Sequence, residues 1–288
     1  MGDIIKSRLK KLLVFFNFTF RIRLNDKKFK IPILGGLGIA NRSISEQWMI
    51  DLLKMLLPIA GSKFIDVGVN IGQTLLAVKC IDEEIKYIGF EPNPSCIHYV
   101  KKLIKTNLFN NTVLVPIGIS TRSNLGELNF YSENDDESSA TMVADFREKK
   151  IIRKELVPQF RVENIKDQIN FKDMSILKID VEGAELKVVE SFKTEIKNYY
   201  PFILMEILPV YNELENPKRL QNQIRLQNIL GEMSYSIFLI IKNNNELIEL
   251  RKISRIGIHS NINNCDYLFV PENRLHQLET IANIVLKY

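Results

Sequence analysis

A glycine-containing turn follows an apolar run early in the chain, where a ligand could bind. In the segment FIDVGVNIGQT, Asp66 lies in the apolar run, and Gly68, Asn70 and Gly72 follow it. A buried strand that leads through such a turn into a helix brings unpaired backbone N–H groups close to a ligand. A dinucleotide fingerprint would need two further glycines, where this chain has Asn70 and Gln73. A pyrophosphate-binding turn is therefore disfavoured.

A second acidic residue ends the next apolar run. Glu91 lies 25 residues after Asp66, and Asn93 follows it between two prolines. At the edge of a parallel sheet, an acid in this position can accept hydrogen bonds from both hydroxyls of a ribose. The turn, Glu91 and Asn93 together predict a site for a nucleoside cofactor that lacks a pyrophosphate. The alternative is a purely structural turn with a helix-capping acid.

These residues need strands and helices to position them, and the sequence pattern supplies both. From Lys63 onward, short apolar runs alternate with longer amphipathic segments. Such alternation is typical of a parallel sheet covered by helices on both faces. The expected strands are Phe64–Val67, Tyr87–Phe90, Val113–Ile117, Ile176–Ile179, Phe202–Ile207, Ile237–Ile241 and Tyr267–Val270. The expected helices are one that begins at Ser45 and ends at Pro58 and Gly61, and the segments 72–81, 94–107, 183–197 and 217–231.

Residues 120–172 interrupt this alternation. They contain a polar stretch, NDDESS, next to a strand-like run at Leu128–Tyr131. We interpret them as an insertion over one end of the sheet. The Asn243–Asn245 run is most simply a turn.

Five segments together resemble the FkbM family of S-adenosylmethionine-dependent methyltransferases. The matching segments are Asp66–Gly72, Phe90–Pro92, Ser138–Ser139, Lys178–Glu185 and Asp266–Val270. The resemblance covers roughly residues 45–271. It implies a Rossmann-like class I methyltransferase fold, an α/β fold with a seven-stranded, mostly parallel sheet and an antiparallel last hairpin. It also implies S-adenosylmethionine as the cofactor and a hydroxyl oxygen of a sugar or polyketide-like molecule as the acceptor.

The resemblance also assigns roles to individual residues. The turn from Asp66 to Gly72 would hold the methionine part of the cofactor, and Glu91 would hold the ribose. One departure follows the third expected strand, where Gly118, Ile119 and Ser120 replace the acid that many class I enzymes use for adenine. Adenine recognition here would therefore rest on backbone or apolar contacts.

Methyl transfer to an alcohol benefits from a general base within hydrogen-bond reach. Strand ends and the loop before the last strand supply Asp180, Glu182, Glu206 and His259. Asp180 is the first choice, because it ends a strand beside the crevice where ligands bind in open α/β sheets. As alternatives, acids at 180 and 182 could stabilise a helix N-terminus, Glu206 could form a salt bridge, and His259 could be a surface residue. No His/Cys cluster supports a metal site, so we expect none; the alternative is a divalent cation held by Asp180 and a second carboxylate, since oxygen ligands suit Mg²⁺.

The positive charge of the chain is concentrated at its start. The first 30 residues carry nine basic and two acidic side chains, while the whole chain has a net charge of only +5. The remainder is close to neutral, which excludes a basic nucleic-acid-binding body. The run Leu12–Phe20 is too short to span a bilayer, which needs about 20 residues, and no signal-peptide cleavage site follows. We expect residues 1–30 either to lie at an anionic membrane surface or to cover an apolar face of the domain as a packed helix.

The cysteines and the domain organisation complete the interpretation. Three cysteines without a CxxC pair predict a reduced, cytoplasmic protein, peripheral at the inner membrane face if residues 1–30 bind lipid. We divide the chain into a basic, aromatic-rich extension, 1–44, and a methyltransferase domain, 45–288. The predicted function is O-methylation of a glycan or another small molecule. The alternatives are a non-catalytic scaffold that binds a membrane or partner through the extension, and a nicotinamide-dependent enzyme such as an oxidoreductase or epimerase.

Overall fold

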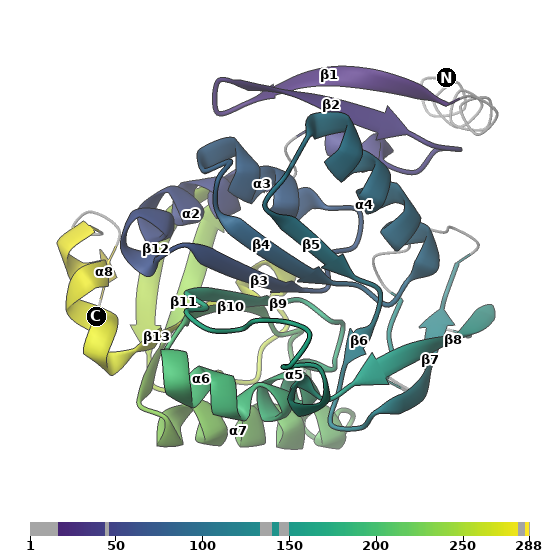
Figure 1. Ribbon diagram of the computed structural model, residues 1–288. Coiled ribbons are helices and arrows are strands. Elements are labelled where there is room, and N and C mark those ends of the chain that lie inside the picture. Colours follow the sequence, from purple (N-terminus) through teal and green to yellow (C-terminus); the bar gives the residue numbers. More distant parts are fainter. Residues whose placement is uncertain (1–16, 44–45, 133–139, 144–149, 282–285, 288) are drawn as a thin grey trace, which may run out of the picture.

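A mixed β-sheet forms the centre of the computed structural model, which describes residues 17–43, 46–132, 140–143, 150–281 and 286–287. Within these residues the sheet has nine strands in the order β14-β12-β11-β13-β10-β9-β3-β4-β5 (Figure 1). The strands are β3 (Lys63–Val67), β4 (Lys86–Phe90), β5 (Thr112–Val115), β9 (Ile176–Ile179), β10 (Phe202–Glu206), β11 (Tyr235–Asn243), β12 (Glu246–Ile253), β13 (Asp266–Pro271) and β14 (Leu286–Lys287).

The direction of the strands confirms the predicted fold class. β5, β4, β3, β9 and β10 run parallel, and β13 lies antiparallel between β10 and β11. All seven predicted strands are present. The prediction of seven strands was too low for the described residues, because the turn at Asn244 and Asn245 leads into β12, which pairs with β11, and β14 pairs with β12. The fold is a Rossmann-like α/β fold with two added edge strands.

Helices cover both faces of the sheet. α2, α3 and α4 pack on one face, and α5, α6 and α7 on the other (Figure 1). The helices are α2 (Gln47–Ala60), α3 (Gln73–Ile81), α4 (Pro94–Asn107), α5 (Glu185–Ser191), α6 (Lys193–Tyr199), α7 (Pro217–Glu232) and α8 (Leu275–Ile281), with short 3-10 turns η1 (Ile39–Arg42), η2 (Val162–Asn164), η3 (Ile262–Asn264) and η4 (Glu272–Arg274). Two helix predictions need correction. α2 continues through Pro58 to Ala60, and the predicted 183–197 helix is two helices that meet at Phe192.

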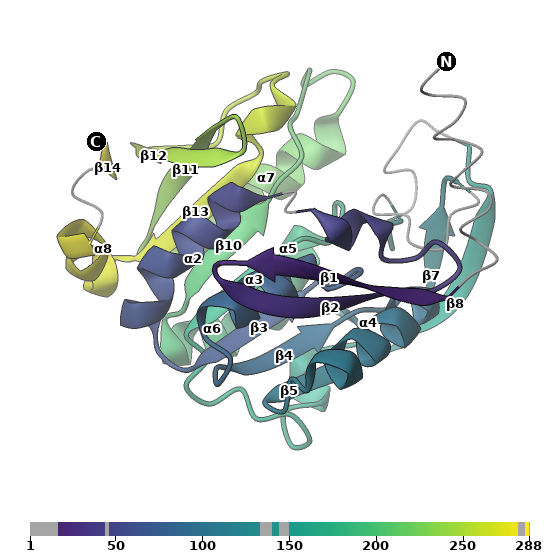
Figure 2. The ribbon, with the colours of Figure 1, turned by 90° about the horizontal axis from the view of Figure 1, so that it is seen from above.

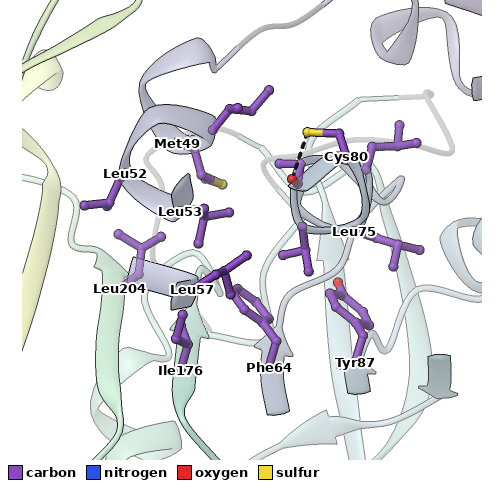
Figure 3. Packing of buried hydrophobic residues seen from close by; sticks show 14 of the residues in the cluster. Met49, Leu52, Leu53, Leu57, Phe64, Leu75, Cys80, Tyr87, Ile176 and Leu204 are labelled. Carbon is purple, nitrogen blue, oxygen red and sulfur yellow. Dashed lines mark hydrogen bonds between the residues drawn. The ribbon is translucent and has the colours of Figure 1, made fainter. Parts of the chain in front are cut away.

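Consecutive residues of the central strands point into two different hydrophobic cores. Phe64 and Ile176 pack with α2 and α3, whereas Ile65 and Leu177 pack with the helices of the opposite face. Figure 3 shows the first of these cores, where Leu53 and Leu57 of α2 face Phe64, Ile176 and Leu204 of three adjacent strands. Burial on both faces explains why these strands are mostly apolar. The sheet is therefore a rigid platform for the loops at its edges.

The interruption predicted at residues 120–172 contains a second, smaller sheet. Its strands, in the order β6-β8-β7, are β6 (Gly118–Ile119), β7 (Asn124–Phe130) and β8 (Arg153–Phe160). The sheet lies beyond the carboxyl end of β5, to the right in Figure 1. The segment 140–143 attaches to it through two backbone hydrogen bonds between Thr141 and Asn129, of 2.9 and 3.1 Å. Ser138 and Ser139, which contributed to the family resemblance, lie outside the described residues.

The N-terminal segment forms a β-hairpin. β1 (Phe18–Leu24) and β2 (Lys27–Ile33) pair antiparallel through a turn at Asn25 and Asp26, both with positive φ. The buried side chains of Phe29, Ile31 and Ile33 join the core under the hairpin. For the described part of the predicted 1–30 segment, the prediction that it covers an apolar face is confirmed, but the predicted helix is wrong, because residues 18–24 and 27–30 lie in strands. The alternation FTFRIRL has the period of a strand.

A helix that crosses a bilayer needs about 20 predominantly apolar residues. Among the described residues, no helix is both long and apolar enough to cross a bilayer. Residues 1–16, which hold the first part of the basic leader, lie outside the described residues.

Candidate functional site

A cavity of about 320 Å³ opens at the carboxyl ends of the central strands. The loops after β3, β4 and β9 and the last residue of β10 line one side of it, and residues of the small sheet line another. In open α/β sheets ligands bind at this edge, where the strand order reverses. Its volume lies within the range of small-molecule sites, about 300–1,000 Å³. The cavity is the candidate functional site.

The turn after β3 brings two loops into close contact. Gly68 has φ +95°, and a Cβ atom there would lie 1.8 Å from the carbonyl oxygen of Asp180. Only glycine fits, because a side chain would collide with the backbone of the loop after β9. Gly68 and Asn70, two residues of the turn predicted to bind a cofactor, both line the cavity. The structural requirement for glycine at position 68 comes from the approach of the two loops.

Glu91 connects the turn after β3 to the start of α4. Its Oε2 accepts a hydrogen bond from the backbone N–H of Asn70 at 2.7 Å, and its Oε1 accepts one from the backbone N–H of Asn93 at 2.8 Å. The side chain lies at the cavity and is almost fully buried. Burial raises the pKa of Glu91 to about 7, although the two N–H donors favour the charged form. Glu91 is thus a fixed hydrogen-bond acceptor at the cavity.

Asn93 also lies at the cavity, as predicted, and it has a structural role. Its side-chain oxygen accepts a hydrogen bond from the backbone N–H of Ser95 at 3.0 Å, which caps the N-terminus of α4. Next to it, the Cys96 thiol donates to the side-chain oxygen of Asn70 at 3.4 Å. The start of α4 and the turn after β3 are therefore held together as one wall of the cavity.

Asp66 and Gly72 do not line the cavity, so the structure does not support their predicted contact with a ligand. Asp66 is fully buried, accepts a hydrogen bond from the Tyr87 hydroxyl, and has its Oδ1 3.4 Å from Nζ of Lys178. Burial raises the pKa of Asp66. Gly72, at the start of α3, packs against Leu103 of α4. Both residues support the turn from behind.

Lys178 is the buried cation of the site. Its Nζ lies 3.2 Å from Oδ2 of Asp180 and donates to the carbonyl oxygen of Gly68 at 3.4 Å. Burial acts to lower the pKa of Lys178, but the carboxylates of Asp180, Asp66 and Glu46 outweigh it and raise the pKa above its usual value. Lys178 therefore stays charged and holds the loops after β3 and β9 together.

Four carboxyl groups gather at the end of the cavity near Lys178, namely those of Glu46, Asp180, Glu182 and Glu206. Burial raises the pKa of Glu46 to about 7. The pKa of Glu206 is raised further, by burial and by repulsion from Asp180, Asp266 and Glu182, and a hydrogen bond joins Glu206 to Asp180. Burial and the neighbouring carboxylates thus favour the protonated form of Glu206, which is hydrogen-bonded to Asp180. The structure brings together three of the four predicted catalytic residues.

The acids in and after the loop that follows β9 have different roles: one stabilises the N-terminus of α5, and others line the cavity. Glu182 adopts a positive φ of 50°, and its carbonyl oxygen accepts a hydrogen bond from the Thr141 hydroxyl at 2.6 Å. The acid that stabilises the N-terminus of α5 is Glu185, whose Oε1 accepts from the backbone N–H of Gly183 at 2.7 Å. Asp180 and Glu182 are thus available to the cavity.

His259 does not belong to this group. It does not line the cavity, and its Nε2 lies 3.2 Å from the hydroxyl oxygen of Tyr267. Its backbone N–H donates to the carbonyl oxygen of Val210, at 3.0 Å. The prediction of a catalytic role for His259 is not supported by this position.

The sequence analysis missed Glu46 and Lys178 as members of the site. Lys178 could have been found, because it is a lysine within the otherwise apolar run Ile176–Ile179 and so needs buried partners. Glu46 precedes α2, and nothing in its sequence surroundings connects it with β9. Among the residues that the structure describes, no group of three or more His, Cys, Asp or Glu side chains could hold a metal ion.

Comparisons with known proteins agree with the family resemblance. A family model, the methyltransferase FkbM domain, matches residues 66–238, which is more than half of the chain. No curated protein matches the chain. Among solved structures, the methyltransferase FkbM from Methylobacillus flagellatus KT is 15% identical, with a TM-score of 0.44 over 73% of this chain and 44% of that one. This chain thus spans less than half of that protein's length.

The match with two other solved structures covers a larger share of their chains. An O-methyltransferase from Bacillus cereus, solved in complex with SAH, is 9% identical, with a TM-score of 0.45 over 78% of this chain and 79% of that one. An S-adenosylmethionine-dependent O-methyltransferase from Thermotoga maritima is 12% identical, with a TM-score of 0.39 over 87% of this chain and 76% of that one.

Proposed function

The chain belongs to the methyltransferase FkbM domain family, and we propose that it transfers the methyl group of S-adenosylmethionine to a hydroxyl oxygen of a glycan or another small acceptor. The observation that carries this proposal is the carboxylate of Glu91, held at the cavity by the N–H groups of Asn70 and Asn93. A fixed carboxylate at the end of the second parallel strand can accept hydrogen bonds from both hydroxyls of a ribose. Each oxygen keeps a further acceptor position for a ligand.

The lining of the cavity fits the three parts of this cofactor. Glu91 would hold the ribose, and the apolar side chains of Ile117 and Ile119 would pack against the adenine. Gly68 and Asn70 would face the methionine part, whose ammonium group suits the carboxylates at that end. When bound, S-adenosylmethionine supplies a methyl group on a positively charged sulfur. The chain's own residues must exclude water, align the acceptor and remove its proton.

Asp180 is the general base in this proposal. Its side chain is 38% exposed at the cavity, so it can reach an acceptor hydroxyl. The carboxyl of Glu206, whose pKa is raised by burial and by Asp180, forms a hydrogen bond that orients Asp180, and the proton of the acceptor is taken up by the Asp180 carboxylate itself. Lys178 holds Asp180 in place through its 3.2 Å contact. Glu182, beside them, would contact the acceptor.

The buried thiols support our proposal that the protein works in a reducing, cytoplasmic compartment. Cys80, Cys96 and Cys265 are all free and buried. Burial raises the pKa of the Cys80 thiol to about 11 and that of Cys265 to about 12, so both stay protonated and unreactive.

Calorimetric titration tests the cofactor. We expect S-adenosylhomocysteine to bind and NAD not to bind, because the turn lacks two of the glycines that a pyrophosphate needs. Glu91→Gln should weaken binding by roughly tenfold to a hundredfold, since the ribose loses a charged acceptor. Glu232→Gln, an exposed change on α7, is the matched control and should bind as the wild type does. Binding of NAD alone would indicate a nicotinamide-dependent enzyme, and binding of neither would indicate a scaffold.

Transfer of a labelled methyl group tests the reaction. Purified protein, labelled S-adenosylmethionine and a panel of sugars and other hydroxylated small molecules should give a labelled ether. Asp180→Asn should lower kcat by roughly a hundredfold or more while S-adenosylhomocysteine still binds, since removal of a general base affects the reaction step. Equal rates in the wild type and Asp180→Asn would reject Asp180 as the base.

A further inference from the structure

One face of the N-terminal hairpin carries cations in opposed pairs. The pairing of the strands places Arg21 opposite Lys30 and Arg23 opposite Lys28, and all four residues are exposed. Residues directly opposite one another in an antiparallel pair point to the same face, with Cβ atoms about 4.5–5.5 Å apart, and like charges there destabilise the pair. The hairpin therefore maintains an arrangement that is unfavourable for its own folding.

The hairpin contains one acidic residue, Asp26 in its turn, and among the described residues no ion pair joins it to these four cations. Neither β1, β2 nor the adjacent helix α4 contains Asp or Glu. In contrast, Lys27, at the inward side of β2, pairs with Glu83 at 3.2 Å. α4 packs beside β2 and adds three exposed cations on its own surface, Lys101, Lys102 and Lys105. In the described part of the chain, none of the seven exposed cations has an ion-pair partner.

The opposite face of the hairpin fixes its orientation. Phe29 and Ile31 are buried against the domain, and the backbone of Lys30 exchanges hydrogen bonds of 2.7 and 2.8 Å with the side chain of Asn107 at the end of α4. Figures 1 and 2 show the hairpin lying across the outside of the molecule, above α3 and beside α4. Its four cations are thus held on a fixed, outward-facing surface.

We propose that this basic face, formed by the hairpin and α4, binds the surface of a membrane that contains anionic lipids. Clustered Lys and Arg side chains are attracted to an anionic bilayer, and their contributions add. The sequence favours a lipid surface over a nucleic acid, because the five residues LLVFF immediately precede Asn17, where the described chain begins. Leucine and phenylalanine next to cations are typical of interfacial segments. The proposal uses no residue of the cavity and is independent of the proposed methyl transfer.

Cosedimentation of the full-length chain with vesicles tests this proposal. The two probes are vesicles of phosphatidylcholine alone and of phosphatidylcholine with phosphatidylglycerol at about three to one. We expect binding only to the anionic vesicles, and we expect it to weaken as salt is added. The variant Arg21→Gln/Arg23→Gln/Lys28→Gln/Lys30→Gln should bind at least roughly tenfold more weakly, because each cation contributes separately.

A second quadruple variant controls for net charge. It replaces four other exposed lysines by glutamine, at Lys86, Lys172, Lys197 and Lys218, and it should keep wild-type binding to within about twofold. The hairpin variant should also unfold at the same or a higher temperature, so that weaker binding is not a result of unfolding. Equal binding of the two variants, no binding of the wild type to anionic vesicles, or tighter binding to a single-stranded oligonucleotide at the same salt would each overturn the proposal.

Discussion

The cavity and the N-terminal hairpin both bring like charges together, but they stabilise them in different ways. At the cavity, Glu46, Asp180, Glu182 and Glu206 line one site with a buried cation, Lys178, and burial raises the pKa of Glu46 to about 7. On the basic face of the hairpin, four exposed cations oppose one another with no ion-pair partner among the described residues. In the first region protons and one lysine relieve the repulsion, and in the second water and salt relieve it.

This difference determines what each region responds to. Buried carboxyl groups can change their protonation, so the stability of the cavity depends on pH. Exposed cations stay charged and interact through solvent, so the hairpin depends on ionic strength. In both regions the cluster of like charges lowers the stability of the folded protein. Such a cluster is retained where it serves to bind a ligand. The predictions below test the comparison from its strongest element to its weakest.

The largest effect should come from Lys178, which is 6% exposed and balances the buried Asp66. Lys178→Met removes the cation and leaves a buried carboxylate without its charged partner. We expect the free energy of unfolding to fall by about 3–5 kcal/mol, the cost of breaking a buried ion pair. Urea denaturation followed by circular dichroism measures this.

A double variant separates the charge from the packing. In Asp66→Asn/Lys178→Met both charges are absent, so we expect it to recover about half or more of the lost stability. If the double variant is as unstable as Lys178→Met, the loss arises from packing, and Lys178 does not balance the acidic cluster.

Much of the fold could be predicted from the sequence, because buried parallel strands leave a strong pattern. Runs such as Phe64–Val67 and Ile176–Ile179 are buried on both faces and are apolar except for one charged residue each, Asp66 and Lys178, and both runs form strands. The edge strand β12 was missed because half-exposed residues hide its pattern. The hairpin was mistaken for a helix because its aromatic residues were interpreted as an amphipathic leader, although they alternate as in a strand.

The site was only partly predictable, for a physical reason. Position at a strand end identified Glu91, Asp180 and Glu206, since carboxyl ends of parallel strands share one edge. Whether the other residues lie at the cavity depends on the direction of their side chains. Asp66 lies within β3 and turns into the protein toward Tyr87, and Glu46 reaches the cavity from a different part of the chain. Such contacts depend on tertiary packing, which local spacing does not encode.

A smaller effect should come from the protonation of Glu46. Its pKa is about 7 in the folded protein and about 4.5 in the unfolded chain, so folding favours the protonated form. This contribution is complete below pH 4.5 and is lost as the pH rises through 7. Glu46→Gln should therefore reduce the loss of unfolding free energy between about pH 5 and 8 by about 2 kcal/mol.

Urea denaturation of wild type and Glu46→Gln at both pH values gives this difference. Glu232→Gln, on the exposed surface of α7, is the matched control and should leave the pH dependence as in the wild type. An equal loss of stability in Glu46→Gln and the wild type would show that the Glu46 carboxyl group does not titrate on unfolding.

The smallest effect should come from the hairpin, where a single charge reversal replaces repulsion by attraction. Arg21→Glu places a carboxylate opposite Lys30, and we expect it to raise the free energy of unfolding by about 0.5–1 kcal/mol. The gain should disappear in about 1 M NaCl, where charges are screened within about 3 Å. Arg21→Gln, which only removes the repulsion, should gain about half as much. If the gain persists at high salt, it arises from strand propensity. Repulsion between the opposed cations would then not measurably lower the free energy of unfolding. The hairpin would not be a region of unfavourable like charges, and the comparison with the cavity would not hold.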